Sequence, residues 1–435
     1  MTTIDITRSA PPGITPARRR LALFALALGG FGIGSSEFVT MGLLPGIAHG
    51  LLPEQMAGDP ESGIAQAGLA ISAYALGVVV GAPVLALLSV RWSRSGMIVA
   101  LAGALAVGTV LSAIMPTFEL TVFARFLAGI PHGAYFGVAS LLAASLMGPG
   151  NQGKGVALAL SGLTVANLAG VPVLTAVGQV AGWRAVYLLI TLIFVATVTA
   201  LRLTVPREEK VAGRRMVDEV MALRRLQLWV IMGIAAVGFA GAFAVFSYVA
   251  DITTNVTGAP AAAVPWVLAA AGLGMTVGNL IGGATTDRSL NGTLMIGFPL
   301  YIASLVGLFL VAHTSLAALL VGFFVVNVTN ASLNPAMQTW LIRVARRSEV
   351  LGASLNHAAF NVANALGASL GGAVIAAGFG YEAPMVVSII LSVLGFSLVA
   401  ATLVALRVRA RRTLEMLRRH EPATTDSIPA VPVHA

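Results

Sequence analysis

The sequence contains no cysteine and little charge. Without cysteine the chain forms no disulfide bonds and offers no thiolate ligands to a metal, and thiol usage gives no indication of its redox compartment. Charged residues make up 10% of the 435 residues, whereas about a quarter of an average soluble domain is charged. So few charges cannot cover a soluble core of this size. The chain is therefore not an ordinary soluble protein.

Hydrophobic residues are abundant instead: they account for 57% of the chain, and the mean hydropathy is +0.90. Apolar runs of about 20 residues or more, the length that a helix needs to cross a bilayer, occur twelve times. They lie near residues 20–48, 63–89, 96–115, 118–146, 154–181, 184–205, 226–256, 262–286, 292–312, 315–342, 350–378 and 383–406. We therefore predict an all-α membrane protein with twelve transmembrane helices.

The net charge is +9, and the charged residues are distributed among the loops in the pattern of a membrane protein. Basic residues lie in alternate short loops, from the Arg18 to Arg20 cluster onward, whereas the other loops hold mainly acids such as Glu54 and Glu61. This positive-inside pattern excludes nucleic-acid binding and predicts a multi-pass protein of the cell (inner) membrane with both termini cytoplasmic. The first apolar run is too long for the apolar region of a signal peptide, so we expect an uncleaved first span.

An internal repeat divides the chain. TVANLAG at 164–170 matches NVANALG at 361–367 at an offset of 197 residues, and Gly81 and Gly278 fall at the same offset. Two pseudo-symmetric six-helix halves around a central cavity are typical of secondary transporters. We expect a monomer, because the sequence shows no interface signal. The predicted parts are a cytoplasmic N-terminal tail (1–19), a six-helix bundle (20–205), a basic cytoplasmic linker (206–225), a second six-helix bundle (226–408) and a basic, then disordered, tail (409–435).

Two charged residues lie deep inside the predicted spans of the first half, away from the span ends. Glu37 is about 15 Å from the outer end of span one, and Arg125 is about 12 Å from the outer end of span four, at a rise of about 1.5 Å per residue. Gly30, Gly34 and Met41 share a helix face with Glu37, which favours a position against protein. Because two charges at one depth in a low dielectric attract each other, we expect them to pair. The pair is either a structural salt bridge or a proton site whose occupancy follows their separation.

His132 follows Arg125 by two helical turns on the same face. An imidazole exchanges protons readily near neutral pH, so His132 is a third candidate for proton coupling. The alternative is a buried histidine whose ring nitrogens are satisfied by hydrogen bonds.

Polar side chains that cannot titrate form a second group of candidates. Four amides follow one face of span ten, at steps that suit a hydrated cavity for a polar or mixed solute or, alternatively, hydrogen bonds between helices. A repeat-related pair of asparagines in spans five and eleven, and one tyrosine of span seven, extend this group. The predicted substrate-binding residues are Asn167, Asn327, Asn330, Asn334, Gln338, Asn364 and Tyr248. The ionisable candidates all lie in the first half, so we expect proton coupling mostly there and solute contacts shared with the second half.

Two motifs are specific enough, when taken together, to indicate a family: EFVTMGLLPGIA at 37–48 and RFLAGIPHGAYFG at 125–137. Together they resemble the major facilitator superfamily, and within it the twelve-span drug:proton antiporter family of arabinose, purine-nucleoside and chloramphenicol exporters. The similarity covers about residues 20–408. It implies that an acid of span one and the arginine of span four, here Glu37 and Arg125, take part in proton coupling.

Span five and two loops match further family patterns in part. The antiporter motif of span five resembles GxxxGPxxGG, and here we expect tight helix packing at Gly162 and Gly170 with a kink at Pro172. The superfamily loop pattern GxxxDRxGRR is similar to segments at 86–95 and 283–291. Its charged residues, which we expect to latch the halves in the outward-open state, are Arg91, Arg94, Asp287 and Arg288. For Arg91 and Arg94 the alternative is a plain orientation signal.

Two segments resemble enzyme motifs but lack the surrounding structure that each motif requires. GPGNQGKG at 148–155 lacks the hydroxyl and the preceding strand of a nucleotide-binding loop. GASLG at 367–371 lies inside a helical span rather than on a strand-to-helix turn. The six histidines show no metal-ligand spacing. We therefore expect no enzyme, metal or cofactor.

The expected function is proton-driven efflux of a small organic solute or drug by alternating access, with the proton gradient as the energy source. The alternative is a proton-coupled importer or a uniporter of a sugar-like or nucleoside-like solute. No second deep acid accompanies Glu37 in the predicted spans, which argues against strongly cationic drugs.

Overall fold

The structure is a computed structural model that describes residues 15–88, 92–148, 150–206, 226–345 and 349–420. These residues form helices and short connections. Twelve of the described helical segments are long and apolar enough to cross a membrane, which confirms the predicted number of spans. The predicted domain boundaries at 206–225 and at the termini lie largely outside the described residues and stay predictions.

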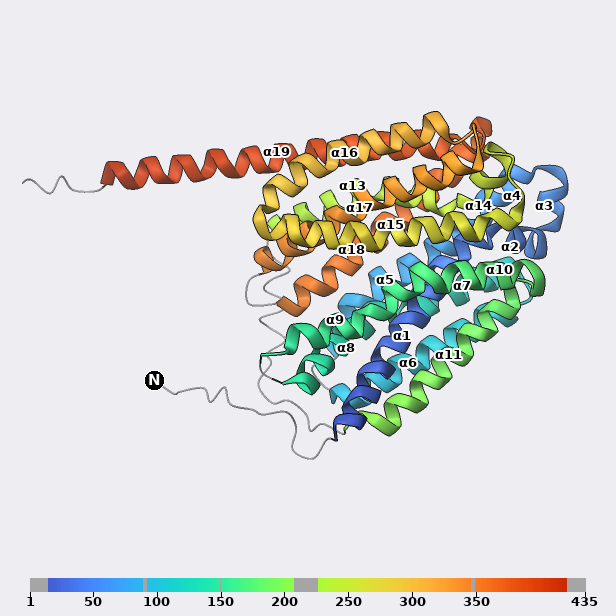
Figure 1. The fold of residues 1–435 in the computed structure, drawn as a ribbon, viewed down its shortest axis with the longest axis horizontal. Coiled ribbons are helices and arrows are strands. Elements are labelled where there is room, and N and C mark those ends of the chain that lie inside the picture. The colour runs from blue at the N-terminus through green and yellow to red at the C-terminus, as the bar shows by residue number, and fades with distance from the viewer. Residues whose placement is uncertain (1–14, 89–91, 149, 207–225, 346–348, 421–435) are drawn as a thin grey trace, which may run out of the picture.

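The first six spans belong to one group of helices (Figure 1). Spans four and five are each built from two helices, because Pro131 interrupts the fourth and a π-helical turn, η2, interrupts the fifth shortly before Pro172. The helices are α1 (Pro16–Gly42), α2 (Leu44–Leu51), α3 (Pro53–Gly58), α4 (Pro60–Ala67), α5 (Leu69–Leu88), α6 (Arg94–Ile114), α7 (Phe118–Gly129), α8 (His132–Met147), α9 (Gln152–Val165), η2 (Ala166–Gly170), α10 (Val171–Ala181) and α11 (Trp183–Thr204).

The second group holds the other six spans. Its first span ends at Ser247, earlier than the predicted 256, and a short helix and a π-helical turn continue the chain. The helices are α13 (Leu226–Ser247), α14 (Val249–Asp251), η3 (Ile252–Val256), η4 (Ala261–Ala263), α15 (Val264–Arg288), α16 (Leu290–Val311), α17 (Leu316–Ala345), α18 (Glu349–Val374), η5 (Ile375–Phe379) and α19 (Ala383–His420).

The two groups lie side by side and diverge toward one end of the molecule (Figure 1). That end carries the start of α1 and the end of α19, and we call it the terminal side. The opposite end carries α2, α3 and α4, and we call it the far side. The spans therefore all run between the terminal side and the far side.

Contacts between the groups concentrate on the far side and in the middle. Ser72 of α5 donates its hydroxyl to the carbonyl of Ala365 in α18 at 3.3 Å. The Phe38 and Phe246 rings meet edge to face with centroids 5.9 Å apart. One hydrophobic cluster contains buried side chains from both groups, including Met41 and Val249. The far side of the interface is therefore closed.

Glycine allows the same close helix packing in both halves. On α5, a Cβ at Gly81 would collide with the backbone carbonyl of Ile130 at the end of α7. On α15, the repeat-related Gly278 faces the backbone carbonyl of Val328 in α17 in the same way. The repeat seen in the sequence thus corresponds to equivalent helix pairs, because small residues let two helix backbones approach closely.

We expect Gly81→Val and Gly278→Val each to destabilise the protein by about 1 to 3 kcal/mol, because a side chain must displace backbone rather than a mobile side chain. The check is the midpoint of thermal unfolding of purified protein in detergent. Gly103→Val and Gly307→Val are matched controls, since a Cβ at either position meets nothing within 4 Å. Equal losses in all four variants would contradict the packing argument.

Candidate functional site

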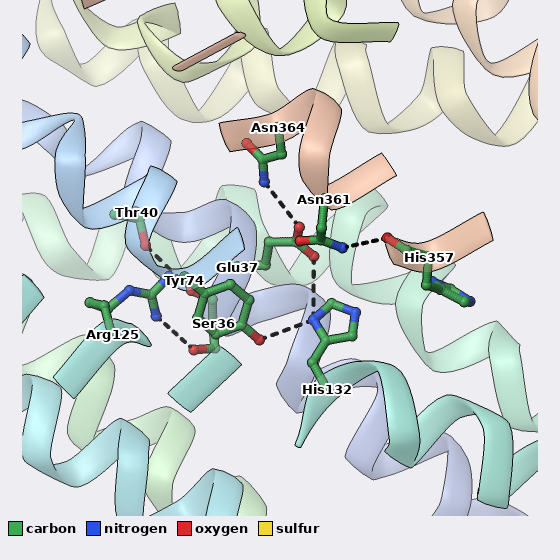
Figure 2. A network of polar contacts seen from close by, with 9 residues as sticks. All are labelled: Ser36, Glu37, Thr40, Tyr74, Arg125, His132, His357, Asn361 and Asn364. Carbon is green, nitrogen blue, oxygen red and sulfur yellow. Dashed lines mark hydrogen bonds and ion pairs between the residues drawn. The ribbon is translucent and has the colours of Figure 1, made fainter. Parts of the chain in front are cut away.

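Glu37 lies five residues before the end of α1, buried between the two halves (Figure 2). Only 6% of its surface is exposed, so the carboxylate faces protein. Its Oε1 accepts a hydrogen bond of 3.1 Å from Nδ2 of Asn364, which belongs to α18 of the second half. Its Oε2 lies 3.9 Å from Nδ1 of His132, which belongs to α8 of the first half. The carboxylate therefore bridges the halves.

Arg125 of α7 is buried beside this bridge but does not pair with Glu37 directly. Its Nη1 donates to Oγ of Ser36 at 3.1 Å, and its guanidinium carbon lies 4.3 Å from the ring centroid of Tyr74. The Nε and Nη2 atoms are buried without a hydrogen-bond partner. The expected ion pair is thus replaced by a contact with the neighbouring serine, because consecutive helical residues point in different directions.

His132, the first residue of α8, connects two polar groups through one nitrogen. Its Nδ1 is 3.2 Å from the hydroxyl of Tyr74 and 3.9 Å from the carboxylate of Glu37. A neutral imidazole carries a proton on one nitrogen only, so Nδ1 either accepts from Tyr74 or donates to Glu37. A change of tautomer or charge on His132 therefore exchanges these two interactions.

His357 of α18 is a neighbour of this cluster that the sequence analysis did not select. Its ring stacks on Phe136 with centroids 5.1 Å apart, and its centroid lies 6.2 Å from that of His132. Asn361 donates to the backbone carbonyl of His357 at 3.0 Å, and Asn364 follows on the same helix face. The spacing of these three residues is the signal that identifies a polar stripe in span eleven.

Asp251 is a second buried acid, and it corrects the expectation that Glu37 stands alone. The residue is 2% exposed, and its Oδ2 has no hydrogen-bond partner. It lies in α14, just beyond the end of the span Leu226–Ser247 on the far side. The analysis of the spans missed it because it occurs among polar residues at the end of an apolar run.

The amide stripe of span ten lies on α17 as the periodicity predicts. Asn327 is buried and donates to the carbonyl of Phe323 in its own helix at 2.8 Å. The side-chain oxygens of Asn330 and Asn334 are buried without a hydrogen-bond partner among the described residues, and Gln338 is half-buried. Two acceptors in this stripe are therefore free to receive a donor.

The other predicted solute contacts differ from one another. Asn364 is fully buried and bonded to Glu37, whereas its repeat partner Asn167 is half-buried in the π-helical turn η2. Tyr248 is buried, and its hydroxyl donates to the carbonyl of Ala368 at 2.7 Å. In this arrangement the Asn364 amide nitrogen and the Tyr248 hydroxyl bond within the protein, whereas Oδ1 of Asn364 is buried without a hydrogen-bond partner among the described residues.

The packing residues of span five approach α1. A Cβ at Gly162 would collide with the carbonyl of Ala27, and one at Gly170 would meet the ring of Phe31. Pro172 is the second residue of α10, directly after the π-helical turn η2. The change in helix geometry therefore begins before the proline.

The predicted latch is not assembled in this arrangement. Arg91 lies outside the described residues. Arg94 is half-buried, Asp287 and Arg288 are exposed, and none of these three forms an ion pair with another described residue. They lie at the terminal side, where the halves diverge (Figure 1).

A separate cavity of about 790 Å³ lies at the terminal side of the second half. Its lining includes Trp340, Arg343 and Arg407 and contains none of the predicted site residues. We therefore place the candidate site at the Glu37 cluster and not at this cavity.

The chain is similar to known transport proteins over most of its length. The model of the Major Facilitator Superfamily matches residues 26–353 and 232–430. The inner membrane transport protein YdhP of Escherichia coli strain K12 is 36% identical over 377 residues, which are 87% of this chain and 94% of that protein. The putative transporter AraJ of the same strain is 33% identical over 362 residues, with coverages of 83% and 89%. The chloramphenicol resistance protein of Streptomyces lividans is 30% identical over 355 residues, with coverages of 80% and 87%.

Solved structures share the fold at low sequence identity. A D-xylose-proton symporter matches with a TM-score of 0.71 at 16% identity, covering 87% of this chain and 97% of that chain. A bacterial homologue of the human lysosomal transporter Spinster, in an inward-facing and unoccupied conformation, matches with a TM-score of 0.66 at 17% identity, covering 88% and 97%. These likenesses support the twelve-helix architecture.

The contact between Ser36 and Arg125 gives a test with a neighbouring control. We expect Ser36→Ala to destabilise the protein by about 1.5 to 3 kcal/mol, because it removes a buried hydrogen bond to a charged group. Ser35→Ala should change stability little, since the Ser35 hydroxyl is buried without a partner. Thermal unfolding of both variants in detergent checks this. Equal stability of the two variants would show that the Ser36 contact contributes nothing.

Proposed function

Because the chain belongs to the Major Facilitator Superfamily, we propose that it is a proton-coupled exporter of a small organic solute or drug. The relationship to a chloramphenicol resistance protein and the partial antiporter motif of span five support export. The relationship to an inner membrane transport protein supports a place in the inner membrane. The distribution of basic residues supports cytoplasmic termini, so that the closed far side faces outward and the conformation is inward-facing.

The single observation that carries this proposal is the bridge made by Glu37. An ionised carboxylate is a strong acceptor for the Asn364 amide of the second half and attracts a protonated His132 of the first half, whereas a protonated carboxyl group has an O–H to donate and weaker acceptor oxygens. Protonation of Glu37 therefore changes the strength of a contact between α1 and α18. A ligand that binds two conformations unequally shifts the balance between them, and here the ligand is the proton.

Arg125 supplies the second partner that such a switch requires. Its two unpartnered donors, Nε and Nη2, remain buried near Glu37 in this conformation. A buried guanidinium without an anion is costly, so a conformation in which the carboxylate reaches it is favoured once Glu37 is ionised. Glu37 would then exchange Asn364 and His132 for Arg125 as the halves rock.

His132 and His357 offer a route for the proton between Glu37 and the terminal side. The 3.9 Å separation of Glu37 and His132 and the 6.2 Å between the two imidazole centroids suit steps through one ring and an intervening water. His357 is half-buried and belongs to the second half, so separation of α8 from α18 interrupts the route. Proton access is thereby tied to conformation.

The solute would contact the amide stripe of α17. The free acceptors of Asn330 and Asn334 suit hydroxyl or amide donors, and the surrounding apolar side chains suit an uncharged organic skeleton. Chloramphenicol, arabinose and adenosine are probes that carry such donors, and a thermal-shift screen of purified protein identifies which of them binds.

We expect Glu37→Gln to abolish accumulation driven by a pH gradient, because an amide cannot carry the proton. The measurement uses everted vesicles with an acidic interior and radiolabelled chloramphenicol, or the probe that the screen selects. Vesicles with the wild-type protein should accumulate the probe as protons leave. Accumulation by the variant should be at least tenfold lower, at the level of vesicles without the protein. Glu119→Gln, which removes an exposed carboxylate, should leave accumulation unchanged.

Three results would overturn this proposal. Accumulation by Glu37→Gln equal to that of the wild type removes Glu37 from coupling. Movement of probe and protons in the same direction identifies a symporter. Probe movement that ignores the pH gradient identifies a uniporter.

A further inference from the structure

The group that the mechanism above leaves unused is Asp251. It ends the short helix α14, which packs against α1 and α2 of the first half and against α15 of its own half. The acid thus lies where the two halves meet on the far side, and opening of that side must change its surroundings.

The surroundings of Asp251 in the closed state are apolar. Leu44 and Ala48 of the first half belong to the same hydrophobic cluster as Val249, Ala250 and Ile252, the sequence neighbours of the acid. Asp251 itself is 2% exposed, and its Oδ2 has no hydrogen-bond partner. Burial of a carboxyl group with one oxygen left without a hydrogen-bond partner favours its neutral form.

Among the described residues, no lysine or arginine lies beside the acid to compensate this burial. The elements α2, α4, α14 and η3 contain no lysine or arginine, and the arginines of α1 and α15 lie at the terminal side. The titratable groups around the acid are Tyr248 before α14, Tyr381 before α19, His49 in the last turn of α2, Glu37 deeper in α1, and Asp59 and Glu61 toward α4.

The carboxylates of this region lie close enough to act on Tyr381. Burial, together with Asp251, Glu61 and Asp59, raises the pKa of Tyr381 to about 12, which places the hydroxyl in a field of carboxylates. Burial raises the pKa of Asp251 to about 7 from the 3.8 of a free side chain. Asp251 therefore holds its proton in the closed state under conditions in which a hydrated aspartate has lost it.

We propose that Asp251 is a second proton-binding site, separate from Glu37, and that its protonation stabilises the closed far side. On opening, water reaches the carboxyl group, which releases its proton to the solvent on that side. On closing, the carboxylate takes a proton from the same solvent before it is buried. This inference rests on the proposed alternating-access function, but it does not require Glu37 to be the coupling acid.

The sign of the pH dependence follows from the two states. The closed state has the higher pKa, about 7, and an open, hydrated aspartate has one near 3.9. The ratio of closed to open molecules is highest at pH values below the lower of these two pKa values. As the pH rises, the ratio of closed to open molecules falls by up to about tenfold per pH unit and levels off above about 7.

The test measures the distance across the far side in the full chain. The sequence has no cysteine, so Gln55→Cys in α3 and Ala377→Cys in η5 create the only two thiols for spin labels, both at exposed positions. Double electron–electron resonance between pH 5 and 8 then reports the closed and open populations. We expect the open population to grow between pH 5 and 7 and to stay constant above.

Asp251→Asn should remove this pH dependence and hold the far side closed throughout. Asp251→Ala is a second neutral variant and provides the same test if the amide does not fold. Retention of the wild-type pH dependence in either variant, or its absence in the wild type, overturns the proposal.

The same labels in the Glu37→Gln background separate the two sites. The part of the pH response that belongs to Asp251 should persist there and should disappear when Asp251→Asn is added. The outcome of the vesicle assay on Glu37→Gln leaves this expectation unchanged, so failure of the coupling proposal is distinguishable from failure of this one.

Discussion

A carboxylate buried between two helical bundles is the constraint on which the rest of the structure depends. In an apolar interior an isolated acid costs several kcal/mol, so its oxygens must find donors or a proton. Glu37 finds one donor in the second half, Asn364 on α18, and in the first half its Oε2 lies 3.9 Å from Nδ1 of His132 on α8. The acid therefore contributes to holding the halves together, and every change in its charge acts on their interface.

The remaining contacts between the halves suit repeated separation. They include a hydroxyl pair between Ser72 and Ser369 at 3.0 Å, an edge-to-face contact between Phe38 and Phe246, and a single bond from Gln179 to a carbonyl of η4. Neutral hydrogen bonds of this kind contribute about 1 kcal/mol each. No inter-half salt bridge occurs among the described residues, so neither conformation needs to break a strong ionic lock.

Much of the fold follows from sequence because lipid imposes a simple requirement. An apolar helix of about 20 residues satisfies its own backbone, so the lengths of the apolar runs predict the twelve spans. Glycine at a fixed offset, as at Gly81 and Gly278, predicts the repeated helix pairs, because only close backbone packing explains it. The depth of Glu37 in the membrane likewise follows from helical rise.

The partners of Glu37 could not be predicted in the same way. Depth places an acid and an arginine at one level, but the direction of each side chain depends on how the helices rotate and pack. Here Ser36, one residue away, receives the guanidinium of Arg125, and Glu37 turns to α8 and α18. Asp251 was missed for a related reason: its burial arises from packing of α14 against α1 and α2 of the other half and α15 of its own, which no local pattern records.

The two halves are alike in backbone and unlike in side chains, and the repeat-related asparagines show this difference. Asn167 and Asn364 are repeat-related, and both lie where one half meets the other. Asn167 presents its backbone to Gly272 of α15, whereas Asn364 bonds the Glu37 carboxylate. The first contact is insensitive to protons and the second depends on them. Under the proposed coupling, rocking of the two bundles would therefore meet a proton-dependent contact at Asn364 and none at Asn167.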